Sequence, residues 1–371
     1  MTSRTNPPDP RVFAGTVAFT ALAALLSWQS FMPTAYLFET TGPALPVSGT
    51  TPADSPVQLV GDAPVYPSKT TLLMTTVSSY GTADESVRGA PAAMSLLDDT
   101  KDLFPVRALY PEEVTGEEVR EFNAVLMENS QSDAVMAGYA QAGITVDVDL
   151  IVAGFSPGSN GEGKIKEGDI VTELSTEEAG TLRPHTYSEL RDYLTKVPVG
   201  ATITVTVDRN GTEKTTSFAT IAPPEDDDRG GSLLGILVAM VIKDDSPSAD
   251  IEIGNIGGPS AGQMFALEIY DQLTEGSLGG DHVIAGTGTI DSLGTVGPIG
   301  GIAHKMRGAS EAGAEYFLAP VANCDEVIGR IPDDLTVISV ATLDDSVHAL
   351  EEIKAGRGSS LPGCEVTDNA K

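Results

Sequence analysis

A serine lies in a turn that consists mainly of glycine and proline. The turn, Gly257-Gly258-Pro259-Ser260-Ala261-Gly262, follows an alternating strand pattern at 251–253 and precedes a largely apolar, helix-like run from Ala261 to Leu273. The first N–H groups of a helix have no partner within the helix and carry partial positive charge. A hydroxyl at this junction could attack a carbonyl group while nearby N–H groups hold the oxyanion. A helix N-cap serine after a Gly-Pro turn is an equally good interpretation of this stretch.

Lys305 is the second residue that could do chemistry. A serine hydroxyl is a weak nucleophile until a base takes its proton, and a lysine is a base only when its amine is neutral. Burial in apolar surroundings lowers the pKa of a lysine from its usual value of about 10.4. The sequence around Lys305 is mostly apolar, and glycines precede and follow the expected helix at 302–312. The pattern is compatible with a buried base, whereas a lysine on a helix is more often a solvated surface charge.

Further motifs follow the serine in a fixed order. They are Ala285-Gly286-Thr287-Gly288-Thr289, Gly297-Pro298-Ile299-Gly300-Gly301, Ala312-Gly313-Ala314, Phe317-Leu318-Ala319-Pro320 and Asn323. With the G-P-S-A-G turn, this series resembles the proteolytic domain of Lon-type serine peptidases. The resemblance implies that Ser260 is the nucleophile, Lys305 the general base and Thr287 a hydroxyl that contacts the lysine. We expect backbone N–H groups from Gly258 to Ala261 to hold the oxyanion.

The sequence departs from the Lon pattern at two positions. Gly257 and Thr289 stand where acidic residues are common in that family. These departures bear on how the pKa of the lysine is set and leave the assignment of Ser260 and Lys305 unchanged.

A different hydrolase fold is the main rival interpretation of the serine turn. Gly258 to Gly262 also fits G-x-S-x-G, the nucleophile elbow of α/β-hydrolases, which needs a later acid and then a histidine. His304 could take that role, but the P-I-G-G-x-x-x-K series would then be unexplained. We therefore interpret all four histidines as structural or surface residues. Histidines, cysteines and carboxylates do not cluster at metal-ligand spacing, so we expect no metal and no cofactor.

Length and charge narrow the class of protein. A chain of 371 residues predicts two to three domains. The net charge of −31 argues against nucleic-acid binding, which needs basic patches.

The first apolar run predicts a membrane anchor. Residues 12–37 carry no charge and are long enough to cross a bilayer, with arginines before them and Trp28 and Tyr36 near the far end. We expect a single-pass transmembrane helix in the cell membrane, a cytoplasmic tail at 1–11 and all later domains outside the cytoplasm. A cleaved signal peptide is the alternative.

The segments after the anchor differ in composition. Residues 38–69 are rich in proline and predict an extended spacer. Residues 70–142 contain a strand pattern and a capping box, Thr115 with Glu118, before a helical pattern. We expect strands and a helix there that could pack on the catalytic domain.

Residues 143–222 resemble a small PDZ domain. The resemblance rests on Phe155-Ser156-Pro157-Gly158, on Gly168-Asp169-Ile170 and on a hairpin around Asn210-Gly211, and we expect a helix capped by Thr186 and Glu189. PDZ domains bind peptides by adding a strand to an exposed sheet edge. The series from Gly158 to Lys164 begins like a P-loop, but Ile165 replaces the Ser/Thr that would hold Mg²⁺. Since no other stretch fits a P-loop, we expect no ATPase and ATP-independent cleavage.

The C-terminal part completes the expected order of domains. A linker at 223–231 leads to a Lon-type proteolytic domain at 232–356, and a mobile tail follows at 357–371. The apolar run at 233–242 is too short to cross a membrane and predicts a buried strand. Cys324 and Cys364 form a disulfide or remain separate, and the sequence leaves both open.

The expected fold is therefore α+β and multidomain, with a transmembrane helix, a β-rich PDZ-like module and an α/β Lon-type domain. The whole chain resembles the PDZ–Lon-type peptidases of Gram-positive bacteria. The resemblance implies a serine endopeptidase that cleaves polypeptides, with the PDZ module recruiting or gating substrates. The alternative is a PDZ-centred peptide-binding scaffold with a silent Lon-like domain. Assembly into a homo-oligomer, such as a hexamer-like ring, is left open, as are the natural substrate, its cleavage sites and any activating signal.

Overall fold

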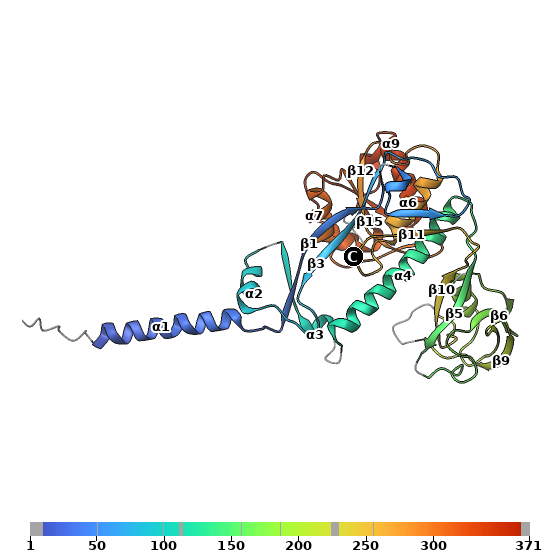
Figure 1. Ribbon diagram of the computed structural model, residues 1–371, viewed down its shortest axis with the longest axis horizontal. Coiled ribbons are helices and arrows are strands. Elements are labelled where there is room, and N and C mark those ends of the chain that lie inside the picture. Colours follow the sequence, from blue (N-terminus) through green and yellow to red (C-terminus); the bar gives the residue numbers. More distant parts are fainter. Residues whose placement is uncertain are drawn as a thin grey trace, which may run out of the picture. The chain divides into compact units, whose positions relative to one another are not determined.

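The computed structural model describes residues 10–49, 51–98, 100–110, 114–156, 158–185, 187–223, 230–254 and 256–364 (Figure 1). Its chain divides into two compact units. Unit 1 comprises Met1–Pro43 and Thr76–Phe122, and unit 2 comprises Ala44–Thr75 and Asn123–Lys371. Strands β1 (Tyr36–Pro46) and β3 (Thr71–Tyr80) and helix α4 (Gly116–Gln141) pass from one unit into the other.

Unit 1 begins with the long helix α1 (Pro10–Phe31). Its stretch Arg11–Phe31 is long and apolar enough to cross a membrane by length and composition, with a mean hydropathy of 1.5. The helix ends earlier than the expected anchor at 12–37, because Pro33 disfavours a helical residue before it. Tyr36 and Leu37, expected in the anchor, instead begin strand β1, and Leu37 is fully buried. Of the expected cytoplasmic tail, residues 1–9 lie outside the described part of the chain.

The rest of unit 1 is small. Tyr36 to Thr40 of β1 pair antiparallel with strand β4 (Lys101–Pro105). The short helices α2 (Gly89–Ser95) and α3 (Val106–Leu109) flank β4 in the chain. The capping box expected at Thr115 is present, since the Thr115 hydroxyl accepts from the Glu118 N–H and the Glu118 carboxylate accepts from the Thr115 N–H.

Unit 2 contains parallel strands that belong to one of the two six-stranded sheets of the described residues. The pairing order is β16-β15-β12-β3, followed by β1. Parallel strands are buried on both faces and so read as short apolar runs. The elements are β12 (Val283–Gly286), β15 (Tyr316–Pro320), β16 (Thr336–Val340) and the helices α6 (Gly262–Leu273), α7 (Ile302–Glu311), α8 (Cys324–Val327) and α9 (Leu343–Lys354).

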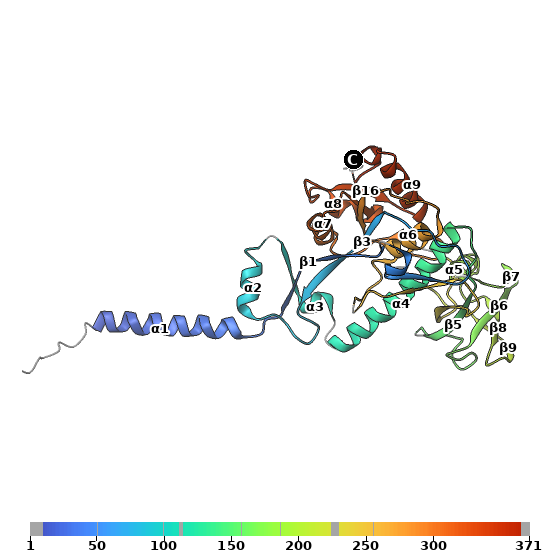
Figure 2. The same ribbon diagram turned by 45° about the horizontal axis from the view of Figure 1, so that its top comes forward.

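Two separate hydrophobic cores cover the two faces of this sheet. The ribbon shows α6 and α7 on opposite sides of strand β3 (Figure 2). Alternate strand residues point to opposite faces. Leu72, Ile284 and Leu318 accordingly join the core that contains α6 and α9, whereas Leu73 and Phe317 join the core that contains α7. Residues from α6 and α7 therefore approach the sheet from opposite sides.

The segment expected to be an extended spacer is folded. Residues 38–69 include most of β1, the 3₁₀ turn Pro52–Asp54 and strand β2 (Val57–Val60). Strand β2 pairs antiparallel with β11 (Ser248–Ile251), and the buried Ser55 hydroxyl donates to Glu268 of α6 over 2.9 Å. The many prolines and threonines indicated a flexible chain, but pairing partners distant in sequence determine its structure. Strand β3, from the segment at 70–142, pairs with β12 in parallel register.

A second, antiparallel sheet forms a β-rich module within unit 2. Its order is β10-β5-β6-β8-β9, with β7 beside β6. The expected hairpin at Asn210-Gly211 is confirmed, with Arg209 and Thr212 exchanging both backbone hydrogen bonds. The elements are β5 (Val148–Phe155), β6 (Ile170–Thr176), β7 (Gly180–Leu182), α5 (Tyr187–Leu194), β8 (Thr202–Asp208), β9 (Glu213–Ala219) and β10 (Ile236–Ile242). Thr186, the expected cap of α5, lies outside the described residues.

Strand β10 differs from the expectation for residues 233–242. It pairs with β5 at the edge of the β-rich sheet and not with the large parallel sheet. Leu237 and Val241 are about half exposed, so the strand is not buried as expected. Most of the expected linker, residues 224–229, lies outside the described part of the chain.

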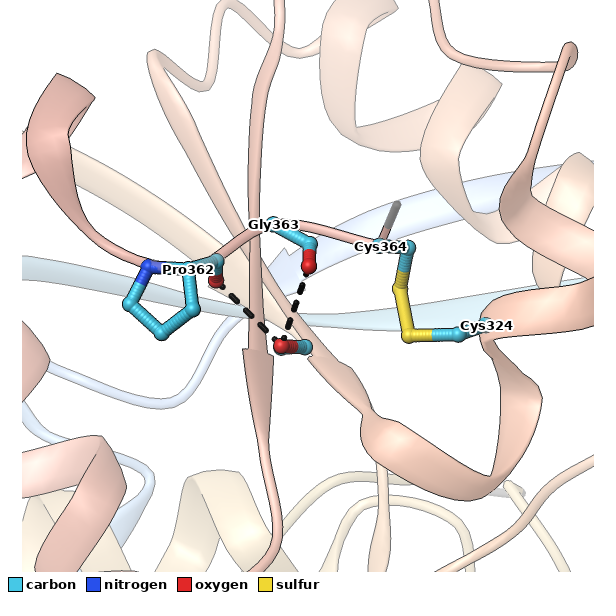
Figure 3. Close-up of a disulfide and its surroundings, with 5 residues drawn as sticks. Cys324, Pro362, Gly363 and Cys364 are labelled. Atoms are coloured by element: carbon cyan, nitrogen blue, oxygen red, sulfur yellow. Dashed lines mark hydrogen bonds between the residues drawn. A yellow bond between two sulfur atoms is a disulfide. The ribbon is translucent and has the colours of Figure 1, made fainter. Parts of the chain in front are cut away.

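The end of the described chain is tied to unit 2 rather than mobile from residue 357 onward. Cys364 forms a disulfide with Cys324 of α8, with a Cα–Cα distance of 4.9 Å (Figure 3). The carbonyl groups of Pro362 and Gly363 accept hydrogen bonds from Ser339 of β16. The sequence left the pairing of the two cysteines open because their separation of 40 residues does not reveal contact. The expected mobile tail beyond Cys364 lies outside the described residues.

Candidate active site

Ser260 lies immediately before α6, in the expected turn. Gly258 adopts φ 91°, a left-handed conformation that favours glycine. The Ser260 carbonyl accepts from the Thr287 hydroxyl and from the Gly288 N–H, both over 2.9 Å. A Cβ atom at Gly262 would lie 2.6 Å from the Ser130 hydroxyl oxygen, so the turn can pack here only with a glycine. Packing of this kind holds the serine backbone against the end of β12.

Lys305 reaches the same place from the other face of the sheet. Its helix, α7, starts after Gly301, which has a φ of 68° and so adopts the left-handed conformation that favours glycine. Ile302, Met306 and Ala309 pack into the core, and Lys305 is only 4% exposed. Its Nζ donates to Ser260 Oγ over 2.7 Å.

Two more oxygens surround the lysine nitrogen. Nζ also donates to Thr287 Oγ1 over 3.0 Å and to the backbone carbonyl of Thr75 over 3.2 Å. Among the described residues, the three hydrogen-bond partners of Nζ are therefore neutral oxygens. The structure brings Ser260, Thr287 and Lys305 together, as expected from the sequence.

The hydrogen bonds define the direction in which protons can move. The Thr287 hydroxyl proton is committed to the Ser260 carbonyl, so Thr287 Oγ1 accepts from the lysine. A neutral amine has two N–H donors and one lone pair. If the two donors go to Thr287 and Thr75, the lone pair faces the Ser260 hydroxyl. The arrangement therefore suits proton transfer from Ser260 Oγ to Nζ.

Burial lowers the pKa of Lys305 to about 8. The cause is desolvation, which disfavours the charged ammonium form. A neutral amine is then present in useful amounts near pH 8, as a general base requires.

The backbone N–H groups expected to hold an oxyanion differ in whether they already donate a hydrogen bond within the protein. The Gly258 N–H donates to the Asn123 carbonyl over 3.0 Å, so it does not point to a free site in this structure. This corrects the expectation for Gly258, and its reason is the contact with α4, which the sequence does not reveal. The N–H groups of Ser260 and Ala261 stay candidates for the oxyanion hole, with Ala261 at the start of α6.

Several groups that shape the site could not be found from local sequence. They are the Thr75 carbonyl of β3, together with Asn123 and Ser130 of α4, whose hydroxyl donates to the Pro259 carbonyl over 2.9 Å. None belongs to a motif, and each lies more than a hundred residues before Ser260. A Cβ atom at Gly257, one of the two departures from the Lon pattern, would lie 2.9 Å from Asn123 Cβ. The contact with α4 therefore excludes an acidic side chain there without rearrangement.

Asn323, noted in the motif series, supports the loop before α7. Its side chain accepts from the Ile299 N–H over 2.9 Å and donates to the Ile299 carbonyl over 2.8 Å. This pair of bonds holds the Pro298 to Gly301 loop from which the lysine helix begins. Its neighbour Cys324 carries the disulfide.

Comparisons with known proteins locate the likeness in the C-terminal part of the chain. Residues 254–352 match the family model described as the Lon protease (S16) C-terminal proteolytic domain. The chain is 40% identical over 92 residues to the Lon protease of Campylobacter concisus, 24% of this chain and 11% of the relative. It is 34% identical over 98 residues to Lon protease 2 of Bacillus subtilis, 26% of this chain and 17% of the relative. The chain thus spans less than a fifth of the length of these curated relatives.

Solved structures of PDZ domains are also similar to part of the chain. A crystal structure of the PDZ domain of an SdrC-like protein from Listeria monocytogenes covers 24% of this chain and 85% of its own, with 18% identity and a TM-score of 0.20. The corresponding domain from Listeria innocua covers 24% of this chain and 92% of its own, with 22% identity and a TM-score of 0.21.

Proposed function

We propose that the protein is a membrane-anchored serine endopeptidase that cleaves polypeptides without ATP. The observation that carries the proposal is the 2.7 Å contact between a buried lysine nitrogen, Lys305 Nζ, and Ser260 Oγ. The match of residues 254–352 to the Lon proteolytic domain supports the same reaction class.

The proposed reaction is acyl transfer to Ser260 followed by hydrolysis. Neutral Lys305 takes the Ser260 hydroxyl proton as Oγ attacks the peptide carbonyl carbon. The N–H groups of Ser260 and Ala261 hold the oxyanion. The ammonium then gives its proton to the departing amine, and the C–N bond breaks. Water repeats the sequence on the acyl-enzyme, with Lys305 again accepting and returning a proton, and releases the acid.

Thr287 positions the other two residues in this scheme. Its hydroxyl joins the lysine nitrogen to the serine backbone through two hydrogen bonds. It touches neither the substrate carbonyl nor the transferred proton, so its contribution is the orientation of the amine lone pair.

Single substitutions test the assigned pair. Full-length Ser260→Ala and Lys305→Ala should each lose cleavage of a fluorescein-labelled unfolded polypeptide while keeping the wild-type circular dichroism spectrum. Ser359→Ala and Lys354→Ala, which change exposed side chains, are matched controls and should retain activity. Turnover that persists in the Ser260 or Lys305 variant would exclude the assignment. ATP added to the wild type should leave the rate unchanged.

Anchoring in the membrane is part of the proposal. The support is the length and apolar composition of α1. Full-length protein should stay with the membrane pellet after alkaline carbonate extraction. A protease added outside intact cells should degrade the folded domains if they lie outside the cytoplasm. Recovery in the soluble fraction would contradict the anchor, and resistance in intact but not in lysed cells would contradict the orientation.

The β-rich module is proposed to recruit or gate substrates as a PDZ domain does. A cavity of about 240 Å³ is lined by residues of α5 and β10, including Leu190, Leu194, Ile236 and Val238. Strand β10 is the last strand of its sheet, so an extended peptide can add to its free edge. Val238→Asp should raise KM for the labelled polypeptide and leave the cleavage rate of a short peptide unchanged. Val241→Asp, on the same strand but outside the cavity lining, is the control.

A peptide-binding scaffold is the second candidate function, and the α5–β10 cavity favours it. It predicts binding of polypeptide with no Ser260-dependent cleavage. Because the active assembly of the enzyme could be a homo-oligomeric ring, the rate should also be measured against the size of the particle by light scattering. A lack of cleavage in every assembly state would favour the scaffold.

A further inference from the structure

Helix α2 of unit 1 ends in an apolar surface that the rest of unit 1 does not cover. Met94, Leu96 and Leu97, here named the α2 tip, are 68%, 72% and 90% exposed. Ala92 and Ser95 of the same helix are buried. One face of α2 therefore packs against unit 1, while a cluster of large apolar side chains projects away from it. Exposed clusters of this kind mark interaction sites.

The position of α2 relative to α1 is defined by several contacts. The Gly89 N–H donates to the Met32 carbonyl over 3.0 Å, and the Thr34 N–H donates to the Val87 carbonyl over 2.9 Å. A Cβ atom at Gly89 would overlap the Gln29 carbonyl oxygen at 2.3 Å, so the start of α2 lies directly against the last turn of α1. The two helices are therefore joined at one point and do not move independently there.

The direction of α2 places the α2 tip at about the same position along the α1 axis as the C-terminal end of α1. Both views of the molecule show α2 lying across the axis of α1, beside its C-terminal end (Figures 1 and 2). A helix of 7 residues is about 10 Å long, so the tip stays close to this level. If α1 crosses a bilayer, α2 runs along the surface from which α1 emerges.

The composition of α2 fits the boundary between lipid headgroups and acyl chains. The nine residues at 89–97 carry no charge, and Arg88 and Asp98 stand at either end. Trp28 and Phe31, both largely exposed, lie in the last turn of α1 at the same end. Apolar side chains on an interfacial helix enter this boundary, and tryptophan is enriched at it.

We propose that the α2 tip inserts into the interfacial layer of the same bilayer that α1 crosses. The inference rests on the proposed anchoring by α1 and adds a second point of lipid contact. Two points of contact fix the rotation of unit 1 about the axis of α1, which a single helix leaves free. The occupant is lipid because the surface continues from the apolar end of the anchor.

The single tryptophan of the chain allows a direct test. The full-length protein is placed in phosphatidylcholine vesicles whose acyl chains carry bromine near the headgroup, and fluorescence is compared with that in unbrominated vesicles. Trp28 in the wild type reports the anchor. The double variant Trp28→Phe, Leu97→Trp reports the α2 tip. We expect bromine to reduce the fluorescence of both proteins to the same extent, with a blue-shifted emission in each.

A matched variant separates lipid contact from mere proximity. Adding Met94→Asp and Leu96→Asp to the Leu97→Trp protein should abolish the quenching, because charged groups on the tip oppose insertion. The same two changes in the wild-type background should leave quenching of Trp28 intact.

The outcomes distinguish this inference from the anchor. Quenching of Trp28 without quenching at position 97 would overturn the α2 contact and leave the anchor standing. A blue-shifted but unquenched signal at position 97 would assign the tip to a protein partner or a second copy and also overturn the proposal. Quenching that survives the two aspartates would show that the apolar tip is not responsible. An unquenched Trp28 would remove the anchor, and the α2 inference with it.

Discussion

The low pKa of Lys305 predicts that activity and stability change in opposite directions when this side chain is removed. The pKa falls from 10.5 to about 8 through burial. At about 1.4 kcal/mol for each pH unit, keeping the ammonium in the folded protein costs about 3 kcal/mol. Lys305→Met removes that cost but leaves the Thr75 carbonyl and Thr287 Oγ1 without their donor, a loss of about 2 kcal/mol. The variant should therefore be inactive and more stable than the wild type by about 1 kcal/mol below pH 8.

The sign of the pH dependence follows from the two pKa values. Between about pH 8 and 10.5 the unfolded chain binds more protons at this residue than the folded protein does, so wild-type stability rises with pH over this window relative to Lys305→Met. Below pH 8 both states are charged and the penalty is complete. Above 10.5 both are neutral and it disappears. The wild type should then be the more stable of the two proteins, by about 2 kcal/mol, because it keeps the two hydrogen bonds that Lys305→Met lacks.

Catalysis should follow the neutral fraction of the same amine. With a pKa of about 8, roughly a tenth of the amine is neutral at pH 7 and about a hundredth at pH 6. The value of kcat/KM for a labelled unfolded polypeptide should thus rise about tenfold per pH unit up to pH 8 and then level off.

The assay combines kinetics with urea unfolding of the full-length protein in detergent, from pH 6 to pH 10.5. Lys214→Met, which removes an exposed lysine, is the control and should match the wild type in both measurements. A rate that is flat from pH 6 to 9 would refute the reasoning about the base. A constant stability difference between wild type and Lys305→Met from pH 7 to 10.5 would refute the burial penalty.

Three further substitutions test other parts of unit 2. Thr287→Val removes the hydroxyl that accepts from Lys305 and donates to the Ser260 carbonyl, so kcat should fall about 10–100-fold. Thr287→Ser keeps a hydroxyl and should stay near the wild type. Equal rates in the two variants would contradict the positioning role. Cys364→Ser removes the disulfide between residues 40 apart in sequence and should lower the free energy of unfolding by about 4 kcal/mol. Dithiothreitol should have the same effect on the wild type. Unchanged urea midpoints in both experiments would show that the disulfide does not stabilise the fold. Burial raises the pKa of Glu268 to about 8, so the stability of the wild type should fall as pH rises from 4.5 to 8. In thermal melts, Glu268→Gln should not show that fall. Parallel curves of melting temperature against pH would show that Glu268 does not titrate in this range.

Local motifs identified the reacting groups. Ser260, Thr287 and Lys305 were predicted from short glycine- and proline-containing turns, and the structure places their side chains within hydrogen-bonding distance. Such turns are recognisable because few residues other than glycine adopt left-handed backbone, as at Gly258 and Gly301.

Sequence composition was a weaker guide where distant segments pair. Residues 38–69 resembled a spacer but contain most of β1 and all of β2. Residues 233–242 had the apolar character of a buried strand, but their strand, β10, lies at the edge of the β-rich sheet. Both errors have one cause. Whether an apolar or proline-rich segment forms a strand, and in which sheet, depends on its partners and not on its own residues.

The sequence by itself determined which groups can react at this site and on which helices and turns they lie, because turn chemistry and helical spacing are local properties. Only the tertiary structure decided that the Gly258 N–H donates to Asn123 of α4 and that Lys305 donates to the Thr75 carbonyl. It also decided that Lys305 is buried. The desolvation that lowers its pKa comes from its burial in the folded protein. That property belongs to the packed protein and cannot be assigned to any one stretch of the chain.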